Sequence, residues 1–347
     1  MINICFITDS NYVLPAMTAI KSLIINNKNE DLCISVIGAG LTEKEQSAIK
    51  KLNTKNAKVE ILAVSEALQD IATAHPYVSQ TALYKFYIPQ IFKELDKILY
   101  LDDDILVKGS VRELYDTDIS DKYAAVVEDM GAELEGFGAK LGLKKYFNSG
   151  MLLLNLKKLR EDNITAKLTE YKKNTPKDYF MDQNALNKIF GENVIYLSPA
   201  YNYMKILDGK PADSVAKFYN LDKTSLSTIS QNPVILHISG EQKPWNTCNA
   251  GCFGDFIYYL LRLPASNIKK QAIIKSLTDL TKTKTKDTIQ NILERLIDFV
   301  PANTYMNLVK KYKNSQISQN VNIVLEQNYI LIKIFGKYRK LNRSKKI

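Results

Sequence analysis

The sequence predicts an α/β fold in which helices flank a mainly parallel sheet and a basic, helical extension follows at the C-terminus. Three observations support this prediction. Short apolar runs typical of strands alternate with helical patterns through the first 130 residues, 347 residues are enough to bury a large core, and lysine-rich polar sequence replaces this alternation near the end. Strands separated by helices indicate βαβ units with right-handed crossovers.

Each expected element has a local signal. Residues 3–8 and 32–37 are apolar runs typical of buried strands, and residues 13–26 between them carry an apolar stripe at helical spacing. Thr42 and Glu45 match a capping box at the start of the next helix. Further strands are expected at residues 59–64, 97–101, 123–127, 150–155, 194–197 and 234–238, and further helices at residues 82–92 and 182–190.

The positive charge is concentrated at the C-terminal end. Residues 265–347 hold 17 of the 47 Lys and Arg but only five of the 37 Asp and Glu, so their net charge is +12 and that of residues 1–264 is −2. The strand–helix alternation also stops there. We therefore expect two parts, an α/β domain over residues 1–263 and a basic, mostly helical region over residues 264–347.

The last residues of the chain, 321–347, interleave basic side chains with apolar and aromatic ones. This pattern fits docking on an anionic membrane face, at about 1 kcal/mol per basic residue. The alternative is a solvated helical tail. Nucleic-acid binding is a competing interpretation of the same charge, but it leaves the near-neutral body unexplained, so no nucleic-acid partner is expected.

Composition also indicates where the protein works. The chain opens without a basic lead, which makes a poor signal peptide, and no apolar run approaches the roughly 18 to 20 residues of a membrane span. Four scattered cysteines are too few for a disulfide scaffold. A cytoplasmic protein is expected, peripheral on the inner face of the cell membrane if the tail docks there.

An acidic triplet, Asp102, Asp103 and Asp104, follows the apolar strand of residues 97–101. Ligands of open α/β sheets bind at the carboxyl ends of strands. Because side chains alternate along extended chain, Asp102 and Asp104 are expected to point the same way and Asp103 the other. Two convergent carboxylates suit a hard divalent cation such as Mn²⁺ or Mg²⁺. The alternative is a solvated acidic loop that only ends the strand.

A second cluster lies at residues 237–245. It combines one of the two histidines, His237, with Gly240, Lys243 and the single tryptophan, Trp245. Imidazole is an acceptable third ligand for Mn²⁺, a lysine can neutralise a phosphate, and a glycine lets the backbone approach it closely. The alternative is a buried core histidine with Trp245 as a packing anchor.

These two motifs together resemble glycosyltransferase family 8, which includes bacterial lipooligosaccharide galactosyltransferases and the glycogenins. The resemblance covers roughly residues 2–250 and rests on motifs in the family's order: FITDSNY at 6–12, YKF at 84–86, YLDDD at 100–104, FNSGMLLLNL at 147–156, DQN at 182–184 and HISGEQKPW at 237–245. Two positions depart from the family pattern. Asp103 replaces a commoner apolar or small residue, and Lys85 stands where bacterial members often have arginine, so a bidentate fork is lost.

The resemblance implies a GT-A fold and retaining transfer of galactose or glucose from a UDP-sugar to a cell-surface glycan or glycolipid. It implies that Asp102, Asp104 and His237 hold Mn²⁺ (or Mg²⁺). The implied donor contacts are Asp9 and Asn11 on uridine, Gly240 and Lys243 on the diphosphate, and Lys85, Asp129, Asn148, Asp182 and Gln183 on the sugar, with Asp103 grouped among the donor-binding residues. Each has a structural alternative: Asp9 and Asp182 as helix caps, for example, and Asn148 as a turn residue.

Retention of configuration requires either a nucleophile behind the anomeric carbon or front-face attack by the acceptor. Gln183 matches the family's position for this role but is a weak nucleophile, whereas the neighbouring Asp182 is a stronger one. We hypothesise front-face attack with Gln183 stabilising oxocarbenium character, while the metal and Lys243 stabilise charge on the diphosphate. The competing hypothesis is a UDP-binding protein without transferase activity.

Overall fold

The computed structural model describes residues 1–63, 80–175, 182–246, 252–260, 262–264, 321–325, 329–334 and 337–342. The chain divides into two compact units, Met1–Ser239 and Gly240–Ile347. The boundary that the sequence places at residue 263 stays a prediction.

The first unit is built on a seven-stranded sheet with the order β3-β2-β1-β4-β7-β6-β8. Neighbouring strands pair in parallel except at β7, which is antiparallel to both β4 and β6. This arrangement confirms the expected mainly parallel α/β sheet. The strands are β1 (Ile2–Asp9), β2 (Leu32–Ala39), β3 (Ala57–Ala63), β4 (Lys97–Leu101), β6 (Ala124–Glu128), β7 (Phe147–Asn155) and β8 (Val194–Tyr196).

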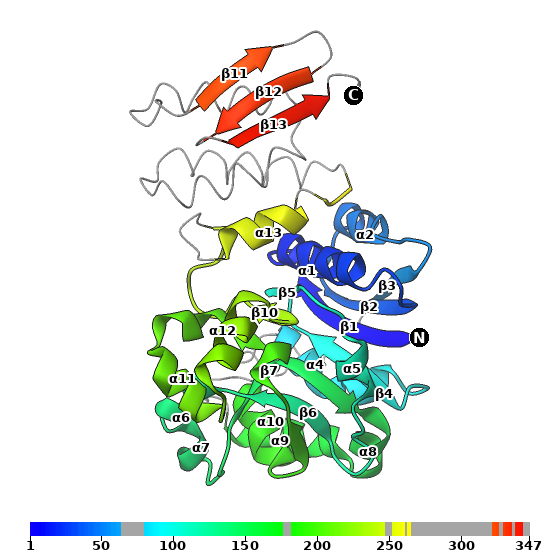
Figure 1. Ribbon diagram of the computed structural model, residues 1–347. Helices are drawn as coiled ribbons and strands as arrows, with labels where there is room; N and C mark the ends of the chain where they lie inside the picture. The colour runs from blue at the N-terminus through cyan, green and yellow to red at the C-terminus, as the bar shows by residue number, and fades with distance from the viewer. Residues whose placement is uncertain are drawn as a thin grey trace. The chain divides into compact units, whose positions relative to one another are not determined.

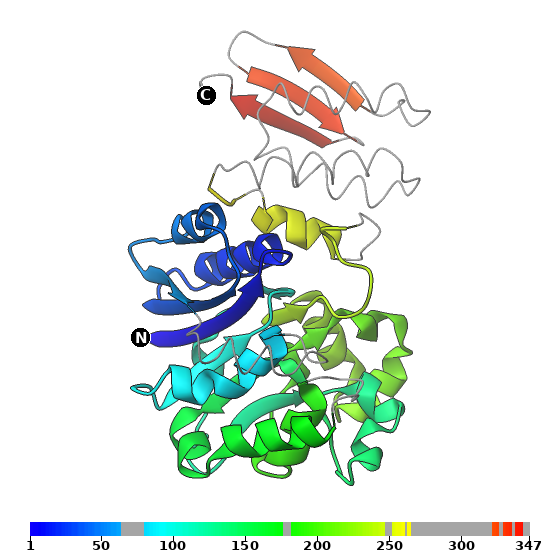
Figure 2. The ribbon, with the colours of Figure 1, turned by 180° about the vertical axis from the view of Figure 1, so that it is seen from behind.

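Helices lie on both sides of this sheet. In both ribbon views α1 and α2 lie on one side of β1, β2 and β3, and α8, α9 and α10 lie on the other side of the sheet (Figures 1 and 2). The described helices of this unit are α1 (Val13–Asn26), α2 (Glu43–Lys50), α4 (Gln80–Ile91), α5 (Arg112–Asp116), α6 (Met130–Leu134), α7 (Phe137–Lys140), α8 (Leu156–Glu161), α9 (Ile164–Asn174), α10 (Gln183–Phe190), α11 (Ala212–Phe218) and α12 (Lys223–Gln231).

Local sequence explains these elements. The capping box expected at α2 is present, since Thr42 Oγ1 accepts from Glu45 N and Glu45 Oε2 accepts from Thr42 N. Every residue of β7 is buried, as both faces of a central strand must be when helices cover the sheet. One apolar core joins α4, α9 and α10 to the sheet and includes the buried rings of Tyr84, Phe147 and Phe190.

A small second sheet, with the strand order β5-β10-β9, begins directly after the acidic triplet. β5 (Ile105–Val107) begins directly after Asp104, and β10 (Ile235–His237) pairs with it in antiparallel register. β9 (Tyr203–Met204) pairs with the other edge of β10. Segments more than 90 residues apart in sequence are therefore held beside the triplet.

The second unit contains α13 (Phe253–Leu260) and an antiparallel sheet of β11 (Val321–Leu325), β12 (Tyr329–Ile334) and β13 (Lys337–Asn342). The expectation of a helical tail is therefore wrong for these strands. Their sequences contain Val, Ile and Tyr, which favour strands, beside the basic residues on which the helical expectation rests. Residues 265–320 lie outside the described residues. Among the described helices, none combines the length and apolar character that crossing a membrane requires.

Candidate active site

The direction of β7 brings polar side chains to the acidic triplet. Because β7 runs antiparallel to β4, its first residues lie beside the carboxyl end of β4, where Asp102 N donates to Gly150 O at 2.8 Å. Asn148 and Ser149 come from this start of β7. β1 also pairs with β4 in parallel, so its carboxyl end, with Asp9, lies at the same edge of the sheet.

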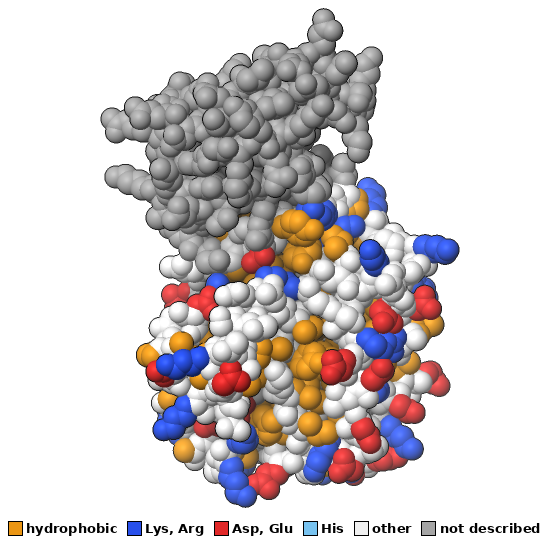
Figure 3. Space-filling view, in the orientation of Figure 1, with side chains coloured by type: hydrophobic (Ala, Val, Ile, Leu, Met, Phe, Trp, Pro, Cys, Tyr) orange, Lys and Arg blue, Asp and Glu red, His pale blue; other side chains and the backbone are white. Residues whose placement is uncertain are grey.

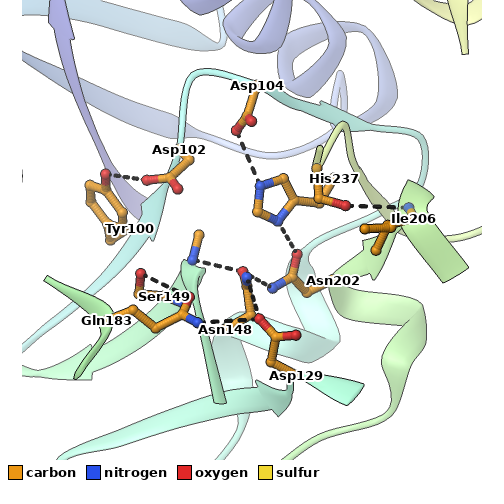
Figure 4. Close-up of polar contacts among 12 residues, drawn as sticks. Tyr100, Asp102, Asp104, Asp129, Asn148, Ser149, Gln183, Asn202, Ile206 and His237 are labelled. Carbon is orange, nitrogen blue, oxygen red and sulfur yellow. Dashed lines mark hydrogen bonds and ion pairs between the residues drawn. The ribbon is translucent and has the colours of Figure 1, made fainter. Parts of the chain in front are cut away.

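The second sheet brings the histidine to the triplet. His237 pairs with Ile105, and Ile238 N donates to Asp104 O at 2.8 Å. The imidazole is buried, with Nε2 3.2 Å from Asp104 Oδ1 (Figure 4). Asp102, Asp104 and His237 each direct one ligand atom into a group that spans no more than 4.8 Å. The three residues predicted as metal ligands therefore lie together.

This cluster fits a divalent cation. Two carboxylates and one imidazole are ligands that Mn²⁺ and Mg²⁺ accept, oxygen being preferred by both. The space among them depends on Gly150, because a Cβ there would lie 2.4 Å from His237 Cε1 and 3.0 Å from Asp102 Oδ2. Any other residue would close the cradle that the three ligands share.

Lys85 connects the metal-ligand cluster to the sugar-binding candidates. Its buried ammonium lies 3.3 Å from Asp102 Oδ1 and 2.5 Å from Asp182 Oδ2, donates to Ser149 O at 3.2 Å, and stands 4.6 Å from the centre of the Tyr100 ring. Burial alone would lower the pKa of Lys85, but the two carboxylates outweigh it and raise the pKa. Lys85 is therefore held as a cation.

Asp182 is the matching anion. Burial alone would raise the pKa of its carboxyl, but the charge of Lys85 and the hydrogen bonds from Lys85 and Ser149 outweigh it and lower the pKa. Asp182 occupies the N-cap position of α10, yet within the described chain its side chain makes no capping hydrogen bond. Helix capping therefore does not account for this side chain.

Gln183 and Asp129 are held by the same network (Figure 4). Gln183 Nε2 donates to Asp129 Oδ2 at 3.2 Å, and Ser149 N donates to Gln183 Oε1 at 3.0 Å. Asp129 also caps α6 by accepting from Ala132 N at 3.0 Å. Both side chains are buried, and these hydrogen bonds fix the orientation of the Gln183 amide and of the Asp129 carboxylate.

The expected opposite direction of the Asp103 side chain stays a prediction, and Asp103 is not one of the three residues whose ligand atoms lie together. It is buried, and its Oδ1 has no hydrogen-bond partner among the described residues. Burial raises its pKa well above the usual range, Thr8 opposes this through a hydrogen bond, and the charges of Asp102 and Asp104 add to it. A role for Asp103 in binding the donor stays a prediction.

The remaining donor-contact candidates divide between the two units. Asp9 Oδ1 accepts from Asn11 N at 2.8 Å and from Tyr12 N at 3.2 Å, so it shapes the turn before α1, and Asn11 is exposed there. Gly240 has a φ of 92°, which favours glycine, and Lys243 Nζ stands 5.8 Å from the centre of the Trp245 ring. The expected contacts with uridine and diphosphate stay predictions.

Sequence reasoning missed two contacts of the site. Tyr100 donates to Asp102 Oδ1 at 2.5 Å. Tyr100 lies on β4 two residues before Asp102, and strand alternation therefore predicts that the two side chains point to the same side. Asn202 is fully buried between Asn148 and His237. It follows the short 3₁₀ turn Pro199–Tyr201, where no periodic pattern marks a buried residue.

Comparison with known proteins agrees with this geometry. The sequence profile of glycosyl transferase family 8 matches residues 3–249. Glycosyltransferase GlyF of Streptococcus pneumoniae serotype 4 is 27% identical over 71% of this chain. The matched region makes up only 57% of the length of GlyF. A lipopolysaccharide 1,2-glucosyltransferase of Escherichia coli is 25% identical, with 79% of this chain and 82% of that protein covered.

Solved structures show the same fold. The crystal structure of galactosyltransferase LgtC with donor and acceptor sugar analogues superposes with a TM-score of 0.66 at 24% identity and covers 78% of this chain and all of that one. LgtC supports the fold, and the profile match over residues 3–249 shows that this chain belongs to glycosyltransferase family 8.

Proposed function

We propose that this protein is a retaining, metal-dependent transferase that moves galactose or glucose from a UDP-sugar to a glycan or glycolipid of the cell surface. The observation that carries the proposal is the convergence of Asp102, Asp104 and His237 within 4.8 Å. Family membership supports a nucleotide-sugar donor. One relative is named a lipopolysaccharide glucosyltransferase and one neighbour a galactosyltransferase, which supports either hexose and a glycan or glycolipid acceptor.

Asp102, Asp104 and His237 would hold the cation, Mn²⁺ or Mg²⁺. When bound, it supplies Lewis-acid neutralisation of the negative charge that develops on the departing diphosphate. Lys243 and the backbone at Gly240 are proposed to add to this stabilisation. Because a nucleoside diphosphate is already a good leaving group, the chain needs no general acid at this step.

The sugar would lie against the network of Asp182, Asp129, Asn148 and Gln183. Asp182 is engaged by the Lys85 ammonium and the Ser149 hydroxyl, which weakens it as a nucleophile but leaves it an acceptor for sugar hydroxyls. Front-face attack is therefore the better-supported route. The acceptor oxygen bonds to the anomeric carbon as the bond to UDP breaks on the same face, and the acceptor proton passes to the departing diphosphate.

Gln183 has the role of a fixed dipole in this proposal. Its carbonyl oxygen accepts from Ser149 N, and its amino group is tied to Asp129, so the side chain needs little reorganisation during the reaction. A preorganised carbonyl dipole stabilises the positive charge of an oxocarbenium-like transition state.

The charge distribution on the described surface does not favour nucleic-acid binding. On the face shown in Figure 3, acidic and basic side chains of the described residues are interspersed, so no single sign dominates it. The membrane-docking function of the basic tail remains a proposal, and with it a cytoplasmic, peripheral location on the inner face of the membrane.

Isothermal titration with UDP, with and without Mn²⁺, tests the metal site. We expect Mn²⁺-dependent UDP binding that Asp104→Ala abolishes and that Asp121→Ala, a change of an exposed aspartate, leaves intact. Release of UDP from UDP-galactose and UDP-glucose in the presence of acceptor glycans then identifies the donor. UDP binding that ignores both metal and Asp104→Ala would contradict the proposal, and UDP binding without turnover of any donor would indicate a binding protein.

A further inference from the structure

A continuous line of buried hydrogen bonds runs from Asp129 through Asn148 and Asn202 to His237 (Figure 4). We propose that Asn202 is a positioning residue that holds the His237 ring with its proton on Nδ1, so that the Nε2 lone pair faces the two aspartates of the metal-ligand cluster. The direction of this line is set at its far end by the Asp129 carboxylate. The inference deepens the proposed function and rests on it only for the identity of the cation.

The orientation of the Asn148 amide follows from two independent neighbours. Its Nδ2 lies 3.1 Å from Asp129 Oδ2, and a carboxylate only accepts hydrogen bonds. Its Oδ1 lies 3.0 Å from Gly150 N, and a backbone amide only donates. Both neighbours require the same orientation, so the oxygen of Asn148 must face the next residue in the line.

The orientation of Asn202 follows from that of Asn148. Asn202 Nδ2 donates to Asn148 Oδ1 at 2.9 Å, which leaves Asn202 Oδ1 facing His237 Nδ1 at 3.0 Å. Asn202 is fully buried. A flipped Asn202 amide would place two carbonyl oxygens against each other in a buried site, and burying unsatisfied polar groups is costly.

The tautomer of His237 follows from Asn202. An amide oxygen facing Nδ1 can only accept, so Nδ1 must carry a proton, and in the neutral ring Nε2 then carries the lone pair. Nε2 lies 3.2 Å from Asp104 Oδ1. That separation is close to the edge of an octahedron with metal–ligand bonds near 2.1 Å, roughly 3 Å. The line of amides thus prepares the histidine as a ligand.

The same line of hydrogen bonds connects the proposed sugar-binding residues with the metal-ligand cluster. Asp129 accepts from both Asn148 and Gln183, so the carboxylate that positions the proposed oxocarbenium-stabilising amide also sets the proton position on the metal-ligand histidine. Removing a residue that holds a metal ligand in place through a hydrogen bond commonly changes metal affinity by roughly 10- to 100-fold.

Nitrogen NMR reads the tautomer directly. The sequence has two histidines, His75 and His237, so His75→Gln leaves a single imidazole for ¹⁵N-histidine labelling. We expect two-bond nitrogen–proton correlations of the metal-free protein above pH 8 to show the proton on Nδ1 of His237. A proton on Nε2 would overturn the proposal without any variant of Asn202, and the measurement uses neither UDP nor sugar. Its outcome is therefore separate from that of the proposed function.

Variants of Asn202 test its role. Asn202→Leu should allow the proton to move to Nε2 and weaken Mn²⁺ binding by tenfold or more in calorimetric titration. Asn202→Asp places a second oxygen against Asn148 Oδ1 and should therefore lower the urea midpoint. It keeps an acceptor toward Nδ1, however, and should retain the tautomer and Mn²⁺ affinity within about threefold. Asn155→Leu is the matched control, because Asn155 is also buried and donates two side-chain hydrogen bonds, to Ile119 O and Ser120 O, at the other end of β7.

The control separates positioning from general loss of stability. Asn155→Leu should lower the urea midpoint while leaving the tautomer and Mn²⁺ affinity unchanged. The proposal is overturned if Asn202→Leu keeps both the wild-type tautomer and the wild-type Mn²⁺ affinity, or if Asn155→Leu weakens Mn²⁺ binding as much as Asn202→Leu does.

Discussion

Removing the charge of Lys85 should destabilise the protein in a pH-dependent way. The side chain is only 6% exposed, and its ammonium contacts two carboxylates, of which Asp182 is 19% exposed and Asp102 is 30% exposed. The isosteric Lys85→Met keeps the packing of the aliphatic stem but leaves Asp182 buried without its cation.

The magnitude follows from the burial of this pair. Deleting one partner of a buried ion pair costs about 3 to 5 kcal/mol, because the remaining charge stays uncompensated. We take the lower value, about 3 kcal/mol, since Asp102 is partly solvated and Ser149 still donates to Asp182. A surface pair is worth at most about 1 kcal/mol, so Lys144→Met, which breaks the exposed pair with Glu192, should change stability far less.

The pH dependence has a definite sign. Because the folded-state pKa of Asp182 is depressed in the wild type, its contribution is complete above the unfolded value of about 3.9 and is lost as pH falls through the lower folded value. Without Lys85, burial dominates and raises the folded pKa above the unfolded one. Lys85→Met should therefore gain stability as pH falls from 7 toward 5, where the wild type should show no such gain from this group.

Urea unfolding followed by circular dichroism at pH 7 and pH 5 measures both effects. Lys85→Arg serves as a second control, because it keeps the charge and should keep the wild-type pH dependence even if the larger side chain costs stability. A loss under about 1 kcal/mol for Lys85→Met at pH 7, or a loss that does not shrink at pH 5, would refute the reasoning.

Three further predictions concern the site and the tail. Gly150→Ala should weaken Mn²⁺-dependent UDP binding at least tenfold, because its Cβ would lie 2.4 Å from His237 Cε1. Gly209→Ala, which has open space around its Cβ, should leave that binding unchanged, and calorimetric titration measures the UDP affinity of both variants. Incubation with donor alone should leave no covalent sugar on Asp182 or Gln183 by intact-mass spectrometry, and a trapped adduct would exclude front-face attack. Truncation after residue 320 should abolish co-sedimentation with anionic vesicles and preserve UDP binding, and unchanged co-sedimentation would contradict membrane docking.

Strong local patterns made much of the fold predictable. Apolar runs such as residues 97–101 are continuous because central strands are buried on both faces, and the capping box of Thr42 and Glu45 is a purely local motif. Strand alternation alone predicts that Asp102 and Asp104 converge. The position of His237 beside them is predicted only by the family motif, because nothing in its local sequence encodes the pairing of β10 with β5.

Other features depended on contacts that a one-dimensional pattern does not carry. Asn202 is buried by neighbours 35 and 54 residues away, and its own turn shows no periodicity. The basic side chains of β11, β12 and β13 are typical of a solvated helix, whereas their β-branched content favours the strands that the structure has. The local sequence does not distinguish a helix cap from an ion-pair partner at Asp182, because Lys85 lies 97 residues earlier in the chain.

The reversal of β7 explains why one edge of the sheet holds so many polar side chains. Parallel strands bring only their carboxyl ends to that edge, and β4 contributes the acidic triplet in this way. An antiparallel strand contributes its amino end instead, so Asn148 and Ser149 meet the triplet while Asn155 lies at the opposite edge and caps α8. A parallel β7 would present its apolar second half to the triplet. The antiparallel strand thus supplies the amides that connect the residues proposed to bind the sugar with those proposed to hold the metal.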